Sequence, residues 1–194
     1  NKITATGPDG KILEFEGKGE LGSLGLTELF FESVEPENAD VPIDELLQTL
    51  PEGDYEFEGS GIEVGEKTGT TTGTALLTHV IPAGPVLLTP AEGEEVPVED
   101  LFVSWEPVET DINGDSEDIN IIAYQLIIEK DEAPHPHMIG KFGLSMYLPA
   151  SVTEITIPGE FLEPGTDYDW EVLAIEESGN QTLVSSSFST ESAE

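Results

Sequence analysis

The chain lacks cysteine and arginine, and it has few lysines. None of its 194 residues is cysteine or arginine, and six are lysine. The absence of cysteine excludes disulfides, iron–sulfur clusters, thiolate metal sites and a cysteine nucleophile. Nucleic acid and anionic membrane surfaces both bind a cationic face, so we expect neither as a partner. No apolar run approaches the roughly 20 residues of a membrane-spanning helix.

Acidic residues dominate instead. There are 41 aspartates and glutamates, which give a net charge of −35. They alternate with apolar residues, as in Tyr55–Glu58 (YEFE) and Tyr168–Glu171 (YDWE), a pattern typical of strands with outward carboxylates. Self-repulsion at this charge is relieved by salt or divalent cations. A saline environment, a calcium-bearing surface and simple solubility all fit.

The first part of the chain predicts a small β domain. A hairpin is expected over 2–19, with its turn at the Gly7-Pro8-Asp9-Gly10 sequence. Leu26–Ser33 (LTELFFES) predicts a buried strand. Further strands are expected at 54–59 and 74–80, joined by a Gly/Thr-rich turn at 65–73. The threonine run at 70–72 fits either a loop or a flat threonine face.

One short helix is expected between these strands. Pro42 suits a first helical position, and Asp44 and Glu45 suit a first turn. Apolar residues then recur with helical spacing on one face, which we expect to cover the open side of the β domain: Ile43, Leu46, Leu47 and Leu50.

The proline-rich segment 81–85 (IPAGP) marks a boundary. Its prolines favour a stiff, extended link. We therefore expect domains at 1–81 and 82–194. The second contains seven strand candidates separated by turn-rich segments: 85–89, 99–105, 120–129, 138–148, 152–157, 167–175 and 182–190. Seven short strands in this length are typical of an immunoglobulin-like sandwich.

Several motifs of the second domain resemble the fibronectin type III family. They match, in order, its second, third and fifth strands, its tyrosine corner, its sixth strand and its closing strand: 101–107 (LFVSWEP), 121–128 (IIAYQLII), 151–158 (SVTEITIP), 162–168 (LEPGTDY), 172–175 (VLAI) and 188–190 (FST). The resemblance implies that Trp105 is buried. It also implies that the Tyr168 hydroxyl bonds a backbone group near Leu162.

The segments 26–33 (LTELFFES), 51–59 (PEGDYEFEG) and 77–85 (LTHVIPAGP) resemble exported bacterial proteins of unassigned role that pair a small β domain with this module. The expected fold class is therefore all-β. A small N-terminal β domain with one short helix precedes a seven-stranded, fibronectin type III-like sandwich. No Arg-Gly-Asp sequence occurs, so the sequence does not support an integrin-type adhesive role.

An acidic loop at 107–118 (PVETDINGDSED) predicts a calcium site. Oxygen ligands at alternate positions with a central glycine are typical of calcium loops. The expected ligands are Asp111, Asn113, Asp115, Glu117 and Asp118. The late glutamate of such loops is replaced by Ile122, so a solvated acidic loop is the alternative. We expect no required cofactor, and calcium is the candidate ligand.

Histidines give weaker signals. His135 and His137, with Met138 beside them, could hold copper or zinc. The adjacent Pro134 and Pro136 favour an exposed loop instead. His79 lies in an apolar segment, where we expect a structural role.

The sequence contains no G-x-S-x-G elbow and no phosphate-binding loop, and we predict that the protein is not an enzyme. The leading hypothesis is a secreted or cell-surface structural or interaction protein, forming a homo-oligomer, surface polymer or filament through sheet edges. The alternative is a carbohydrate-binding accessory module, calcium-dependent or not, with Tyr147 or Phe161 as its platform. A carboxylate enzyme requires a pocket in which two acids converge.

Overall fold

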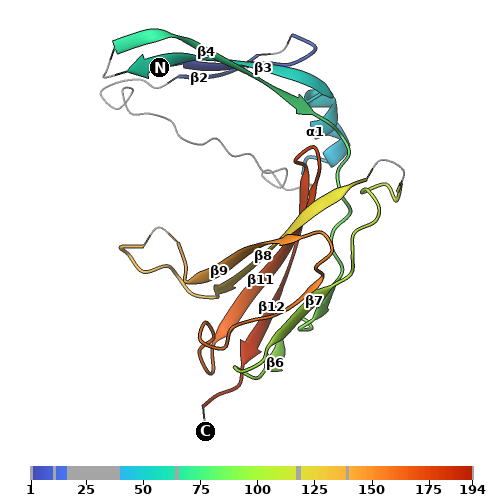
Figure 1. Ribbon diagram of the computed structural model, residues 1–194, viewed down its shortest axis with the longest axis vertical. Helices are drawn as coiled ribbons and strands as arrows, with labels where there is room; N and C mark the ends of the chain where they lie inside the picture. Colours follow the sequence, from blue (N-terminus) through green and yellow to red (C-terminus); the bar gives the residue numbers. More distant parts are fainter. Residues whose placement is uncertain are drawn as a thin grey trace. The chain divides into compact units, whose positions relative to one another are not determined.

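The computed structural model describes residues 2–10, 12–16, 40–63, 66–116, 119–138 and 140–193, with the backbone alone at 61–63 and 66–68. The chain forms two compact units, Asn1–His79 and Val80–Glu194 (Figure 1). The division falls two residues before the boundary expected from the sequence. No helix in the described ranges is long and apolar enough to cross a membrane.

The first unit contains an antiparallel sheet with strand order β2-β1-β3-β4. Its strands are β1 (Lys2–Thr6), β2 (Ile12–Glu16), β3 (Gly53–Glu63) and β4 (Glu66–Leu77). The turn predicted at 65–73 is wrong, because β4 already pairs with β3 there, with Thr72 opposite Glu58. β-branched threonines suit a pleated strand, so the 70–72 run extends the hairpin. The strand expected at Leu26–Ser33 lies outside the described residues.

The register gives this sheet two different faces. Pairing places Ala5 opposite both Leu13 and Phe57, so apolar side chains share one face. Thr4 lies opposite both Glu14 and Glu58, so the other face is polar and acidic. The alternation noted in the sequence therefore separates carboxylates from apolar side chains, as expected.

The predicted helix is present as α1 (Ile43–Thr49). Its three apolar residues and Leu50, which follows it, are half-buried, so the expected face is the one covered. The Leu50 carbonyl just beyond the helix lies 2.7 Å from Nε2 of His79, and the His79 amide donates to Glu52 at 2.6 Å. His79 therefore joins the end of β4 to the end of α1, the structural role expected for it.

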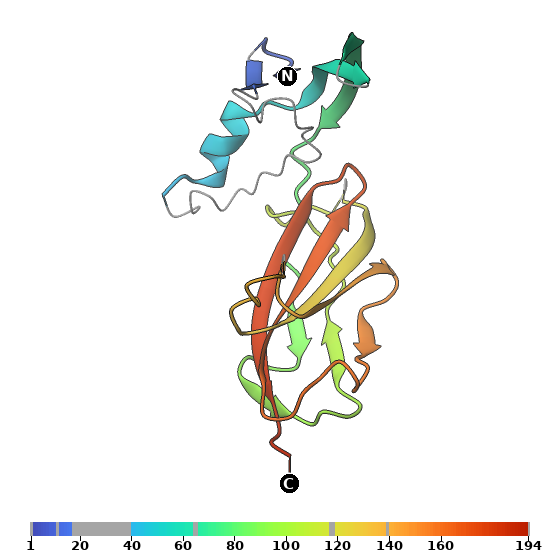
Figure 2. The same ribbon diagram turned by 90° about the vertical axis from the view of Figure 1, so that its left-hand side faces the viewer.

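The second unit is a sandwich of two sheets (Figure 2). One sheet has the order β10-β7-β5 and the other β6-β12-β11-β8-β9. The strands are β5 (Leu87–Thr89), β6 (Glu94–Val96), β7 (Phe102–Trp105), β8 (Ile121–Lys130), β9 (Gly143–Pro149), β10 (Glu154–Thr156), β11 (Asp167–Glu176) and β12 (Gln181–Thr190). All seven expected strands are present.

Strand β6 is additional, because 90–97 was expected to be a turn. It pairs in parallel with β12, with Val96 opposite Thr190. Its sequence, Glu-Glu-Val, is too short to show an alternating pattern, so this pairing depends on a distant segment that local sequence does not reveal.

Aromatic rings fill the core between the sheets. Trp105, Trp170, Tyr124, Tyr168 and Phe188 are each at most 2 % exposed. Trp105 meets Tyr124 edge to face at 5.5 Å, and Tyr168 stacks on Phe188 at 5.2 Å. Offset and edge contacts of this kind add to the large free energy of burying aromatic area.

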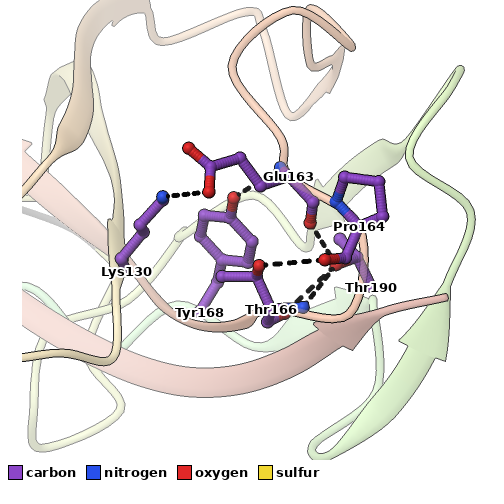
Figure 3. Close-up of polar contacts among 6 residues, drawn as sticks. All are labelled: Lys130, Glu163, Pro164, Thr166, Tyr168 and Thr190. Carbon is purple, nitrogen blue, oxygen red and sulfur yellow. Dashed lines mark hydrogen bonds and ion pairs between the residues drawn. The ribbon is translucent and has the colours of Figure 1, made fainter. Parts of the chain in front are cut away.

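The corner before β11 is closed by hydrogen bonds (Figure 3). The Glu163 amide donates to the Tyr168 hydroxyl at 2.8 Å, which confirms the tyrosine corner expected near Leu162. The Thr190 hydroxyl donates to the Glu163 carbonyl and accepts from the Thr166 amide. Lys130, at the end of β8, also binds Glu163, with its Nζ 2.6 Å from the Glu163 carboxylate.

Candidate functional site

The acidic loop at 107–118 is anchored at its start and closed on itself. The Val108 amide donates to the Tyr124 hydroxyl at 2.8 Å, and burial raises the pKa of Tyr124. Further along, the Asp111 carboxylate accepts the Asn113 and Asp115 amides, each at 2.8 Å. These bonds, the Asp115 amide above all, lower the pKa of Asp111. Asp111 thus folds its own loop.

The 80–85 segment belongs to the second unit and is held by this loop. The Ala83 amide donates to Thr110 and the Ile112 amide to Ile81, both at 2.9 Å. On its other side, Thr182 donates its hydroxyl to the Pro82 carbonyl at 2.6 Å. The two unusual features of the sequence, the acidic loop and the proline-rich link, therefore lie side by side.

The expected calcium ligands are only partly described. Asp111, Asn113 and Asp115 lie in the loop, and the Asn113 side-chain amide donates to Asp111 at 3.1 Å. Glu117 and Asp118 lie outside the described residues. Within the described ranges, no group of three or more acidic or histidine side chains is placed to hold a metal. Calcium binding stays a prediction.

The histidine pair lies in an exposed turn before β9. The His137 amide donates to Nδ1 of His135 at 3.3 Å, and the rings are 5.5 Å apart. Because Nδ1 accepts this bond, it is not free to bind a metal in this conformation. The exposed loop favoured by the prolines is what the structure contains.

A shallow groove of about 440 Å³ crosses the outer face of the five-stranded sheet. Its polar lining includes the Ser185–Ser187 run and four carboxylates: Glu92, Glu129, Asp169 and Glu171. Lys141 lies 3.6 Å from Asp169, whose side chain is 45 % exposed. The register places Glu129 directly opposite Asp169. The groove therefore brings acids together, but in an open, solvated setting.

The two aromatic residues expected to form a carbohydrate platform lie in different environments. Tyr147 on β9 is 71 % exposed. Phe161 packs against the core, with its ring 5.9 Å from that of Tyr168. No aromatic side chain lines the groove. The described residues thus do not bring the two together as a binding surface.

Two long sheet edges differ from the rest. Strand β4 spans 12 residues, and its only charged residues are Glu66 and Lys67 at its start. Strand β9 spans seven residues with no charged residue at all. In the described part of the chain, each pairs with a neighbour on one side only. Such edges present unpaired backbone donors and acceptors to other strands.

The construction of the second unit identifies its fold. Two antiparallel sheets enclose the Trp105 core, and the tyrosine corner lies just before the strand next to last. That combination is the one expected from the sequence motifs. Val80–Glu194 has the fibronectin type III fold.

Comparison with known proteins finds similar chains among solved structures. No family model and no curated protein matches. The fibronectin type III domain of human collagen α-1(XX) is 23 % identical, covering 57 % of this chain and 87 % of its own, with a TM-score of 0.39. The third such domain of human KIAA0343 protein is 17 % identical over 60 % and 89 %, with 0.42. A two-domain segment of chicken tenascin is 16 % identical over 97 % and 83 %, with 0.39.

The length of the β4 edge was missed from the sequence. The Gly/Thr-rich composition of 65–73 predicts a turn and leaves the threonine run open between a loop and a flat face, although threonine is a strand former. An uncharged run of ten residues at 68–77 in so acidic a chain was the available signal.

Proposed function

We propose that this protein is a non-enzymatic structural or interaction protein of the cell exterior that joins other chains through its sheet edges. The carrying observation is that β9 and residues 68–77 of β4 carry no charge, in a chain with 41 acidic residues. Self-assembly into an oligomer, polymer or filament is the form we favour.

The remaining edges are protected by familiar means. Strand β2 carries Glu14 and Glu16, and Glu14 pairs with Lys2 at 2.5 Å. Strands β5, β6 and β10 are three residues long each. Charge and shortness both prevent edge-to-edge pairing. The contrast supports β4 and β9 as contact surfaces.

The groove gives little support to catalysis. General-acid chemistry uses a carboxyl group held in an apolar setting away from water. Here the Asp169 side chain is nearly half exposed and has Lys141 beside it. The location outside the cell is supported by the fold, which many cell-surface proteins use, and this support is an argument by analogy.

Light scattering and electron microscopy of the full chain test the proposal. We expect species larger than the monomer at physiological and high salt, because cations screen the charge of −35. Measurements with and without millimolar calcium separate a calcium effect from simple screening. A strict monomer at every salt concentration would overturn the proposal.

A further inference from the structure

We infer that the edge of β4 pairs antiparallel with β4 of a second copy of this chain, about a two-fold axis at Thr71. This inference rests on the proposed function and names its contact surface and its occupant. The axis would join two four-stranded sheets into one sheet with eight strands. A two-fold contact of this kind closes on itself and gives a dimer.

The central part of β4 reads the same in both directions. Residues 68–74 are Thr-Gly-Thr-Thr-Thr-Gly-Thr, centred on Thr71. Antiparallel pairing about that residue places Thr70 opposite Thr72, and Gly69 opposite Gly73, in both halves of the contact. Cross-strand threonine pairs are favourable. The glycines meet only each other, so no bulky side chain faces a gap.

Strand β4 is also exposed on both faces of its sheet. Every residue from Gly69 to Leu76 is exposed, so within the described residues neither face of this part of the strand packs against a core. Strands that are polar on both faces and rich in glycine have weakly specified pairing and accept alternative partners. Proline, which would block a ladder, is absent from the strand.

Charge explains why a second copy is tolerated here. Around Thr71, the nearest acids lie one strand away on β3, where Glu56 faces Thr74 and Glu58 faces Thr72. The one acid of β4 itself, Glu66, stands at the start of the strand, beside Lys67. In the dimer, the two β3 strands would be three strand spacings apart, about 14 Å. Screening acts over about 8 Å at physiological salt but about 30 Å at 0.01 M. The dimer should therefore weaken sharply as salt is removed.

Single cysteines test the register, because the chain has none of its own. Thr71→Cys places two thiols directly opposite each other, with Cα atoms about 5 Å apart, within disulfide range. In Thr74→Cys, the two cysteines of the dimer would be six residues apart along the paired strands, a distance of about 20 Å. We expect oxidation to convert most of the Thr71→Cys protein to covalent dimer, and little of Thr74→Cys.

A mixture sharpens the test. Thr70→Cys and Thr72→Cys should form a mixed disulfide together more readily than either forms a disulfide alone, because residues 70 and 72 are opposite in this register. Thr71→Glu should raise the dissociation constant at least tenfold by opposing two carboxylates, whereas Thr71→Val should retain dimerisation.

The failures are distinguishable. If the unmodified chain forms dimers but Thr71→Cys crosslinks no better than Thr74→Cys, the β4 register is wrong and the proposed function stands. Preferential crosslinking of Ser145→Cys on β9 would move the contact to the other edge and overturn this inference. A chain that is monomeric at all salt concentrations defeats both.

Discussion

The two units bury their apolar side chains to very different extents. Among the described residues, the second unit contains every buried apolar side chain except Ala5. In the first unit, Leu13 and Phe57 on the apolar face are 44 % and 40 % exposed. One unit thus has a closed core between two sheets, while the described sheet of the other is thinly covered.

This difference indicates which part of each unit is available for contacts with other molecules. A closed sandwich gains stability from its core and can carry long acidic loops at its ends. A thinly covered sheet gains less, and an edge such as β4 can gain further stability by pairing. Burial on association adds to the stability of such a unit by mass action. The predictions below test this contrast, beginning with the largest effect.

Removing an aromatic ring should give the largest difference in stability loss between the two units. Trp170→Ala deletes a fully buried indole, and we expect a loss of about 3 to 5 kcal/mol from the second unit. Phe57→Ala is the matched change in the first unit, where about 1 kcal/mol is expected because the ring is partly exposed.

Urea unfolding measures both changes. Both tryptophans of the chain lie in the second unit, so Trp105 still reports its unfolding in the Trp170→Ala variant. Circular dichroism follows both units together. Equal losses in the two variants would contradict the difference in packing described above.

The tyrosine corner should give the next largest effect. Tyr168→Phe removes the acceptor of the Glu163 amide at a partly buried site. An unsatisfied donor there should cost about 1 to 2 kcal/mol. Tyr147→Phe, at a 71 % exposed position, should change stability by less than about 0.5 kcal/mol. Comparable losses in both would show that the corner hydrogen bond is not what stabilises the second unit.

Periodicity and motif spacing predicted the sandwich better than the first unit, for a physical reason. The long central strands of the sandwich, β8 and β11, alternate over most of their length between buried and more exposed positions, since one face of each is buried. Strand β4 is exposed on both faces, so no alternation marks it, and its glycines resemble a turn. The parallel pairing of β6 depends on residues about 94 positions away, which no local pattern encodes.

Only part of the candidate site could be predicted from the sequence. The acidic loop was found from its composition, but the bonds that Asp111 makes within its own loop depend on backbone geometry. The groove joins residues from β8, β11 and β12. A groove of that kind follows from the register between strands.

The ion pair between Lys130 and Glu163 should show its effect at alkaline pH. The hydrogen bond to Glu163 raises the pKa of the Lys130 amine. Stability from this pair is therefore fully present below the unfolded-state pKa and is lost as pH rises through the folded one. Glu163→Gln should shift the alkaline unfolding midpoint of the second unit to lower pH, measured by tryptophan fluorescence. Glu154→Gln, on the other sheet, is the control and should leave it unchanged.

The acidic loop should respond in the opposite direction. Its backbone amides, Asp115 foremost, hold the pKa of Asp111 below its usual range. The loop's contribution to stability is present above the unfolded-state pKa of Asp111 and is lost as pH falls through the folded value. In carboxyl-resolved NMR, Asp111 should titrate below the usual range of an aspartate, and the Asn113 and Asp115 amide shifts should follow it. Asp111→Asn should abolish that titration of the amides. Amide shifts that titrate unchanged in Asp111→Asn would show that another group closes this loop.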